Sequence, residues 1–402
     1  MTIAFLVCLA TATLEPSASP STDAALPEKG VAPPPAADKV EVSAKFGDGV
    51  TVKAGDFKLN LRGRIQVQGL SLIPTEGSTA VRQNAIMVRR ARLVLKGDLP
   101  WHLTMNLQLA FSAQDMEPDA PNVLRDFNVQ WAPLRDLSLR LGQMKVPFDV
   151  QRITSSSAQQ FVDRSTVTGE FNLDRDVGLV AYSDDFLGLN GRLRYALGVF
   201  GGDGRNRMGT NIGLLYAGRI RYSVFGPFDD KIEGDPARDS LFRLAVGAGV
   251  GHNVATNRPR STFVTPYRAA RFDYTHATGD IHLKWRGLSL LSEIYWRNAN
   301  ENQQTHVVSG SALTEYSRSG WGWFTQFGAY LTPWLELGAR YGDSTPFAGT
   351  DPTFSRLREI GGTVNLMFDA HNLKLQTDAF WLDDGRGGNG RVQVRIQAQV
   401  FF

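Results

Sequence analysis

Cysteine, runs of basic residues and long hydrophobic segments are all scarce in this sequence, and each scarcity excludes a class of protein. The single cysteine, Cys8, leaves no disulfide scaffold and no cysteine-ligated zinc site. The formal net charge is only +3 and no run of five basic residues occurs, so the charge does not indicate a nucleic-acid partner. No stretch approaches the eighteen apolar residues that a membrane-spanning helix needs. The mean hydropathy of −0.21 does not exclude membrane strands, because alternating residues cancel within any window.

The first 55 residues differ in composition from the rest of the chain. Residues 3–12 form an apolar run that is too short to span a membrane but suits the core of a signal peptide, although no Lys or Arg precedes it. Prolines among Ala and Ser then predict an extended linker. Residues 40–53 read as a small hairpin outside the main domain. We therefore expect a signal peptide over 1–25, a Pro-rich linker with a short hairpin over 26–55, and a main domain over 56–402.

From residue 56 onward, apolar and polar residues alternate with a period of two. Trp101 to Phe111 places six apolar side chains on one face, and Arg391 to Phe402, RVQVRIQAQVFF, repeats the pattern. Period two puts alternate side chains on opposite faces of a β-strand, and no helical period of 3.6 persists anywhere. We predict sixteen strands, near 57–67, 90–96, 101–111, 123–133, 136–146, 176–183, 192–200, 212–225, 241–252, 278–286, 288–297, 320–331, 334–343, 355–368, 371–382 and 391–402.

The connections between these strands alternate between short and long. Short links such as 332–333 and 369–370 alternate with longer ones such as 147–175 and 298–319. Short turns at one end and long loops at the other are typical of an outer-membrane barrel. The link 226–240 is too long for the short side. The pattern predicts an all-β fold: a transmembrane antiparallel β-barrel of about 16 strands.

Alternation alone does not say which face meets water. A soluble β-sandwich buries its apolar face, whereas a membrane barrel turns that face to lipid and lines a water-filled lumen with polar residues. Sixteen amphipathic strands would be unusually many for one soluble unit. Aromatic residues near the strand ends favour the membrane barrel, because they would form interfacial girdles: Trp101, Phe111, Trp131, Trp285, Trp296, Tyr341 and Phe402.

Basic residues exceed acidic ones on the polar faces of the predicted strands. The acidic residues found there are Asp126, Asp280, Glu293 and Glu336. Basic side chains that line a pore select anions, and the guanidinium fork of Arg matches phosphate oxygens. A solvated charged face with no ligand remains the alternative. The basic residues are Lys58, Arg62, Arg64, Arg90, Arg92, Lys96, Arg140, Arg192, Arg194, Arg219, Arg221, Lys284, Arg286, Arg340, Arg391 and Arg395.

Several short motifs resemble the phosphate-selective porins of the O and P type. They are RRARL at 89–93, LGQMKVPF at 141–148, FVDRS at 161–165, RDVG at 175–178, YALGVFGGDG at 195–204, GRI at 218–220 and ELGARY at 336–341. Gly201 stands where that family is expected to have Asn. The resemblance implies a sixteen-stranded barrel that forms trimers, an infolded loop that narrows the pore, and a ladder of arginines that guides anions. The loop would be 147–175, with Arg152, Arg164 and Arg175 near the constriction beside Asp163, Glu170 and Asp174.

We therefore expect a channel of the bacterial outer membrane for passive, anion-selective diffusion, with inorganic phosphate, polyphosphate or other small anions as solutes. It would be a homotrimer in outer-membrane lipid, with no nucleic-acid partner, no cofactor, no metal site and no catalytic residues. If the last strand closes against the first, Arg395 should lie near the height of Arg62 and Arg64. The alternatives are a general porin with mild anion bias and a soluble or surface-displayed β-rich binding protein. The attracting wall would comprise Arg62, Arg64, Arg90, Arg92, Arg192, Arg194, Arg219, Arg221 and Arg395.

Overall fold

A computed structural model describes residues 39–76, 78, 81–117, 121–207, 213–227, 229–261, 263–385 and 390–402. The predicted signal peptide and the part of the linker up to residue 38 lie outside the described residues. None of the described helices is long and apolar enough to cross a membrane.

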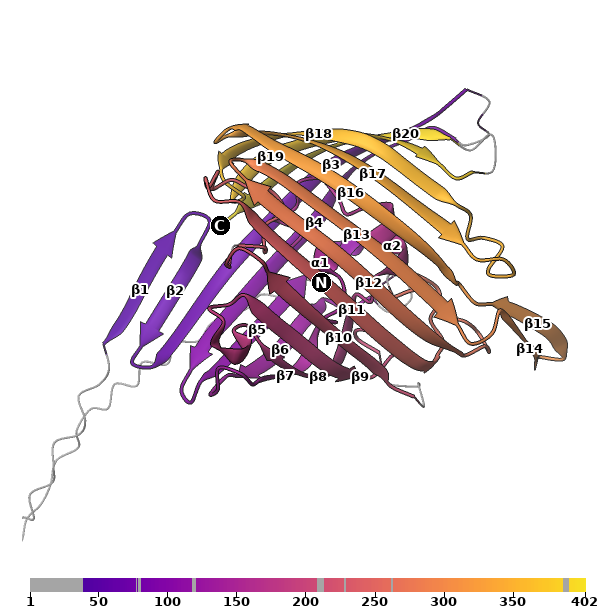
Figure 1. Cartoon of the computed structure of the whole chain (residues 1–402), viewed down its shortest axis with the longest axis horizontal. Coiled ribbons are helices and arrows are strands. Elements are labelled where there is room, and N and C mark those ends of the chain that lie inside the picture. The colour runs from indigo at the N-terminus through magenta and orange to yellow at the C-terminus, as the bar shows by residue number, and fades with distance from the viewer. Residues whose placement is uncertain are drawn as a thin grey trace, which may run out of the picture. The chain divides into compact units, whose positions relative to one another are not determined.

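Sixteen strands form one closed antiparallel barrel (Figure 1). Each strand pairs with its sequence neighbours, and β20 returns to pair with β3, so the barrel has no open seam. The predicted fold is confirmed, and each predicted strand overlaps one of these sixteen. They are β3 (Phe57–Pro74), β4 (Gln83–Leu99), β5 (Leu103–Ala110), β6 (Leu124–Trp131), β7 (Ser138–Lys145), β8 (Arg175–Ser183), β9 (Leu193–Phe200), β10 (Leu215–Ser223), β11 (Arg243–Thr256), β12 (Phe272–Trp285), β13 (Leu288–Ala299), β16 (Gly320–Thr332), β17 (Leu335–Pro346), β18 (Leu357–Asp369), β19 (Leu373–Asp383) and β20 (Arg391–Phe401).

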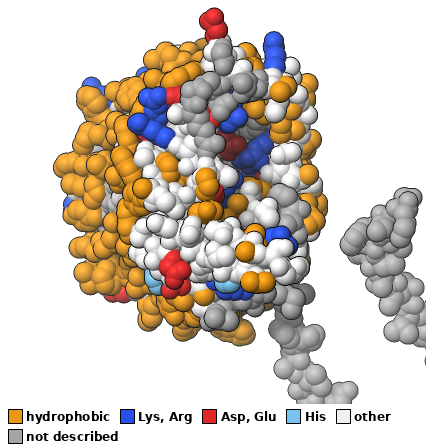
Figure 2. Space-filling model, turned by 90° about the vertical axis from the view of Figure 1, so that its right-hand side faces the viewer, with side chains coloured by type: hydrophobic (Ala, Val, Ile, Leu, Met, Phe, Trp, Pro, Cys, Tyr) orange, Lys and Arg blue, Asp and Glu red, His pale blue; other side chains and the backbone are white. Residues whose placement is uncertain are grey.

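The alternation of the sequence becomes an apolar outside and a polar inside. On β12, Ile281 and Trp285 point outward and are 47% and 39% exposed, whereas Asp280 and His282 point inward and are 5% and 1% exposed. Figure 2 shows hydrophobic side chains spread over the outer wall, with a hollow at one end where charged side chains are visible. This arrangement is that of a barrel in lipid and the reverse of a soluble sandwich.

The closing pair of strands has a different register from the one that we expected. Arg395 pairs with Leu70, whereas Phe401 pairs with Arg64. The prediction that Arg395 lies near the height of Arg62 and Arg64 is wrong, because β3 continues to Pro74 and the antiparallel register carries Arg395 toward its far end. Leu70 lies six residue steps along the strand from Arg64, a distance of about 20 Å.

Two hairpins accompany the barrel. β1 (Val40–Lys45) and β2 (Gly49–Ala54) form the predicted N-terminal hairpin, but β2 pairs with the start of β3, so the hairpin extends the barrel sheet. β14 (Gln303–Val308) and β15 (Ser311–Tyr316) form a separate two-stranded sheet within the link between β13 and β16.

The link between β7 and β8, residues 146–174, folds into the barrel as predicted. It carries α1 (Val150–Ile153) and α2 (Thr166–Phe171), and short 3-10 turns lie elsewhere at Ala113–Asp115 and Phe186–Gly188. Phe171 of the loop stacks on Tyr295 of β13, with 6.0 Å between the ring centroids. We call residues 146–174 the constriction loop.

Wall carboxylates hold the first amides of both loop helices. Glu293 accepts a hydrogen bond from the backbone N–H of Val150 at 2.8 Å, and Glu359 accepts one from that of Thr166 at 3.2 Å. The first amides of a helix have no partner within the helix, and they carry the positive end of its dipole. The wall therefore fixes the loop through both of its helices.

Candidate pore and its charged lining

The tip of the constriction loop lies against β3 and β4. Arg64 Nη2 donates to Ser156 Oγ at 2.9 Å, and Arg92 Nη1 donates to the same atom at 3.2 Å. The loop thus brings two guanidinium groups from neighbouring strands to one hydroxyl. Two of the predicted site residues, Arg64 and Arg92, therefore lie close together in the structure.

Loop acids reach the arginines of β4. Asp163 accepts from Arg90 at 3.0 Å and from Arg89 at 2.9 Å, while Asp115 accepts two bonds from Arg92 at 2.6 and 2.8 Å. Burial tends to raise the pKa of Asp163, but the charges of Arg89 and Arg90 outweigh it and hold that pKa well below its usual range. The positive charges of Arg90 and Arg92 are therefore largely balanced by the carboxylates of Asp163 and Asp115.

The three arginines that we expected at the constriction differ in their partners. Arg152 donates to Asp174 at 2.6 Å, and Arg175 donates to Asp126 at 2.9 and 3.1 Å. Arg164 donates to the carbonyl oxygens of residues 151 and 154 at 2.9 and 2.7 Å, and no carboxylate pairs with it among the residues that the structure describes. Only Arg164 of the three keeps an uncompensated charge.

The arginines of β9 and β10 are paired with acids. Arg194 donates to Asp230 at 3.1 Å, Arg221 lies 2.6 Å from the same carboxylate, and Arg219 and Arg221 both bind Asp280. Arg192 differs, because it bonds to the end of β10 through Tyr222 Oη at 3.1 Å. The predicted attracting wall is thus largely neutral on this side.

Arg395 on β20 is also paired. Its guanidinium donates to both oxygens of Asp378 on β19, at 2.7 and 2.8 Å, and Asp378 also accepts from the backbone N–H of Val162 at 3.0 Å. Asp378 thereby connects β19, β20 and the constriction loop.

Four of these counter-charges, Asp126, Asp163, Asp174 and Asp280, were named from the sequence without their arginine partners, whereas Asp115, Asp230 and Asp378 were missed. Asp115, Asp163, Asp174 and Asp230 lie in connections, where alternation carries no information about what enters the lumen. Asp378 could have been found, because it occupies the polar face of β19 with Lys374 and Gln376. Their common effect is to reduce the basic excess of the lumen to a few positions.

A cavity of about 470 Å³ is lined by several basic side chains that have no carboxylate partner among the described residues. It lies beneath the tip of the constriction loop, toward the end of the barrel with the short turns. Its two carboxylates have other partners: Asp98 lies 3.7 Å from Lys58, and Asp48 lies 2.6 Å from Lys45. The lining comprises Asp48, Thr51, Lys58, Asn60, Arg62, Arg64, Arg92, Val94, Lys96, Asp98, Asn106, Gln108, Ser155, Ser157 and Phe401.

Three basic residues of this cavity have no carboxylate partner among the described residues: Arg62, Arg64 and Lys96. Arg62 donates to Asn372 Oδ1 at 2.6 Å, and its guanidinium lies over the ring of Phe401. We call Arg62, Arg64 and Lys96 the cationic wall. This wall and the polar side chains of Asn60, Asn106 and Gln108 make the cavity suited to a hydrated anion.

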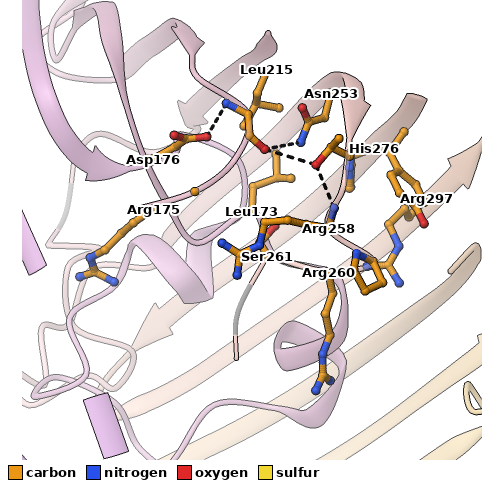
Figure 3. Close-up of a pocket in the computed structure, with 15 residues that line it drawn as sticks. Leu173, Arg175, Asp176, Leu215, Asn253, Arg258, Arg260, Ser261, His276 and Arg297 are labelled. Carbon is orange, nitrogen blue, oxygen red and sulfur yellow. Dashed lines mark hydrogen bonds between the residues drawn. The ribbon is translucent and has the colours of Figure 1, made fainter. Parts of the chain in front are cut away.

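A smaller cavity of about 20 Å³ lies on the other side of the constriction loop (Figure 3). Figure 3 shows Arg258, Arg260, His276 and Arg297 around it, and Asp176 accepts a hydrogen bond from the backbone N–H of Gly202 at 2.8 Å. Glu170 holds Arg297 at 2.5 Å on this side. The volume is enough for a single water molecule, so no solute is accommodated there.

No three His, Cys, Asp or Glu side chains among the described residues are arranged to hold a metal ion. Asp280 and His282, which share a strand face, are engaged elsewhere: Asp280 binds Arg221 at 2.5 Å, and His282 Nε2 lies 2.9 Å from the carbonyl oxygen of Glu233.

A closed barrel of sixteen strands, apolar outside and polar inside, with a loop folded into its lumen, defines a porin-type channel of the outer membrane. Residues 57–226, from β3 through β10, match the model of the family described as phosphate-selective porin O and P. The predicted family resemblance is confirmed over these residues, and with it the bacterial outer-membrane location. The matched family is described as one of porins, and the fold is that of a porin-type channel.

Solved structures of other porins share the fold at low sequence identity. An anion-selective porin from Comamonas acidovorans is 15% identical, with a TM-score of 0.56, over 86% of this chain and 100% of that one. The outer-membrane channel DcaP of Acinetobacter baumannii is 12% identical, with a TM-score of 0.56, over 87% and 99%. OmpF of Salmonella typhi is 15% identical, with a TM-score of 0.54, over 86% and 98%. No curated protein matches the chain.

Proposed function

We propose that this channel passes small anions by diffusion and prefers phosphate or polyphosphate. The observation that carries the proposal is the cationic wall of Arg62, Arg64 and Lys96 in the 470 Å³ cavity. These side chains supply positive charge that the described carboxylates do not neutralise. Guanidinium groups bind phosphate oxygens through paired N–H donors, which favours phosphate over chloride.

A general porin with a mild anion bias is the second candidate. The pairing of Arg194, Arg219 and Arg221 with Asp230 and Asp280 favours it, because only one side of the lumen then attracts anions. One of the structural neighbours is itself described as anion-selective, which is compatible with both candidates. The two candidates differ in whether phosphate competes with chloride.

We also propose that the channel is a homotrimer in outer-membrane lipid. The family resemblance supports this assembly, and the apolar outer wall offers a surface for either lipid or a neighbouring subunit. A surface-displayed or soluble β-rich binding protein would lack heat-modifiable migration on a gel and would not partition into detergent.

Planar-bilayer recording tests the proposal. Under a KCl gradient, the unmodified channel should favour chloride, and added phosphate should reduce the chloride current. The double variant Arg62→Gln and Arg64→Gln should lose most of the chloride preference and respond less to phosphate. Arg135→Gln is the matched control, because Arg135 is exposed in a short turn and pairs with Asp136.

Two outcomes would contradict the proposal. Cation preference in the unmodified channel would exclude anion selectivity. A chloride current that phosphate does not change would exclude the phosphate preference and leave the general porin.

A further inference from the structure

The link between β10 and β11 is unusually long for its end of the barrel. It spans residues 224–242, whereas the other connections at the same end hold at most nine residues: 100–102, 132–137, 184–192, 286–287, 333–334 and 370–372. In outer-membrane barrels the short turns face the periplasm. A long segment at this end therefore has to lie either below the barrel or within it.

The part of this link over residues 229–235 lies within the barrel. The Lys284 ammonium of β12 donates to the carbonyl oxygens of Asp229 and Ile232 at 2.5 and 2.7 Å. The backbone N–H of Gly287 donates to Asp235 Oδ2 at 2.7 Å. These bonds attach both ends of the segment to the wall. We call residues 229–235 the inner turn.

The inner turn meets the constriction loop in the lumen. The backbone N–H of Glu233 donates to the carbonyl oxygen of Ala158 at 3.1 Å, and Gln160 returns a bond from its own N–H to Glu233 Oε2 at 2.9 Å. Gln326 of β16 donates to the same oxygen at 2.9 Å. Glu233 is 1% exposed. The two segments enter from opposite ends of the barrel and join beside this strand.

Asp230 holds the inner turn through charge. Its carboxylate, 9% exposed, is bound by Arg194 of β9 and Arg221 of β10. Removing the carboxylate would leave Arg194 without its carboxylate partner and Arg221 with Asp280 alone, and the two neighbouring guanidinium groups, as like charges, would repel each other. Asp230 therefore ties the inner turn to the wall by pairing with two strands at once.

We propose that the inner turn is a second constriction element, inserted from the periplasmic end, that limits the size of solutes. The inner turn contacts β9, β10, β12 and β16, whereas the 470 Å³ cavity lies beside β3 to β5. Asp230 is a positioning residue for this element. The proposal concerns size and holds for any solute, so it is independent of the anion preference.

Liposome swelling with neutral sugars of increasing size tests the proposal without involving charge selectivity. Asp230→Asn should raise the entry rate of disaccharides and trisaccharides about twofold or more, with little change for monosaccharides, because pore size limits large solutes most. Asp229→Asn is the matched control: it makes the same charge change one residue away, on a side chain that is exposed. It should behave as the unmodified channel does.

A charge-neutral variant separates size from electrostatics. Arg194→Gln combined with Asp230→Asn leaves the net charge unchanged and should still raise the entry of the larger sugars. Unmodified rates in both Asp230 variants, or an equal rise in the control, would overturn the proposal. Heat-modifiable migration verifies that each variant is folded.

A cysteine pair covers the case in which the Asp230 variants do not fold. Ala158→Cys with Glu233→Cys should form a disulfide on oxidation in the assembled channel, with sugar entry no faster than in the unmodified protein. Absence of this cross-link in the folded channel would overturn the proposal, because the inner turn would then lie away from the constriction loop.

Discussion

The guanidinium carbon of Arg62 lies 3.7 Å from the centre of the Phe401 ring, so a residue of β20 positions a cation on β3. Both side chains line the 470 Å³ cavity. The contact is a cation–π interaction, worth roughly 0.5–1 kcal/mol at a partly exposed site and more when desolvated. The seam of the barrel thereby contributes to the cationic wall.

Replacing the ring should weaken this positioning. Phe401→Leu is expected to lower the chloride preference modestly, because Arg62 keeps its charge but loses the aromatic face. The reversal potential under a KCl gradient measures the change. Phe401→Tyr keeps the ring and should retain the full preference; an equal loss in both variants would contradict the interpretation.

The pairing of Arg395 with Asp378 predicts a structural role rather than a role in the pore. Arg395→Gln should destabilise the barrel by about 3–5 kcal/mol, since it leaves a buried carboxylate without its cation. Urea unfolding followed on a semi-native gel measures the effect. Asp378→Asn in the same chain should restore much of the stability, whereas unchanged stability with altered phosphate inhibition would instead place Arg395 in the permeation path.

The attachment of α2 to the wall predicts the behaviour of the constriction loop. Glu359 accepts from Ser165 Oγ at 2.6 Å and lies 3.1 Å from Arg340. Glu359→Ala should loosen the loop and increase open-channel current noise at least about twofold, since three donors lose their shared acceptor. Glu359→Gln keeps an acceptor oxygen, so its open-channel current noise should be lower than that of Glu359→Ala. Equal noise in the unmodified channel and in both variants would refute this role of Glu359.

Salt should reveal which charges attract the permeating ion. The Debye length falls from about 10 Å at 0.1 M to about 3 Å at 1 M, so the chloride preference should decline as KCl concentration rises. The double variant Arg62→Gln and Arg64→Gln should show a much smaller decline. The measurement is the reversal potential at a fixed concentration ratio over this range; a decline equal to that of the unmodified channel would assign the attraction to other residues.

The sequence predicted the strands of the barrel wall far better than it predicted the segments and ion pairs inside the lumen. Alternation is local, and the strands from β3 to β20 follow it, so their faces and number could be read directly. The position of Asp163 or Asp230 depends on how a connection folds back through space, which no period within the sequence records. Arg194 and Arg395 therefore looked free from the sequence, although each has a carboxylate beside it. The register of β20 on β3 was missed for a related reason: the length of β3 decides it.

The hairpin of β1 and β2 has a consequence for self-association. β20 covers β3 only as far as Arg64 and the backbone of Gly63, and β2 then covers residues 57–61, where Phe57, Leu59 and Leu61 alternate with polar residues. Without β2, the amides of that stretch would form an apolar template for strand addition by another chain. The hairpin replaces it with the outer edge of β1, VEVSAK, which carries two charged side chains. Charged edges resist such pairing. The hairpin therefore leaves a charged strand rather than an apolar one at the edge beside the closing pair of strands.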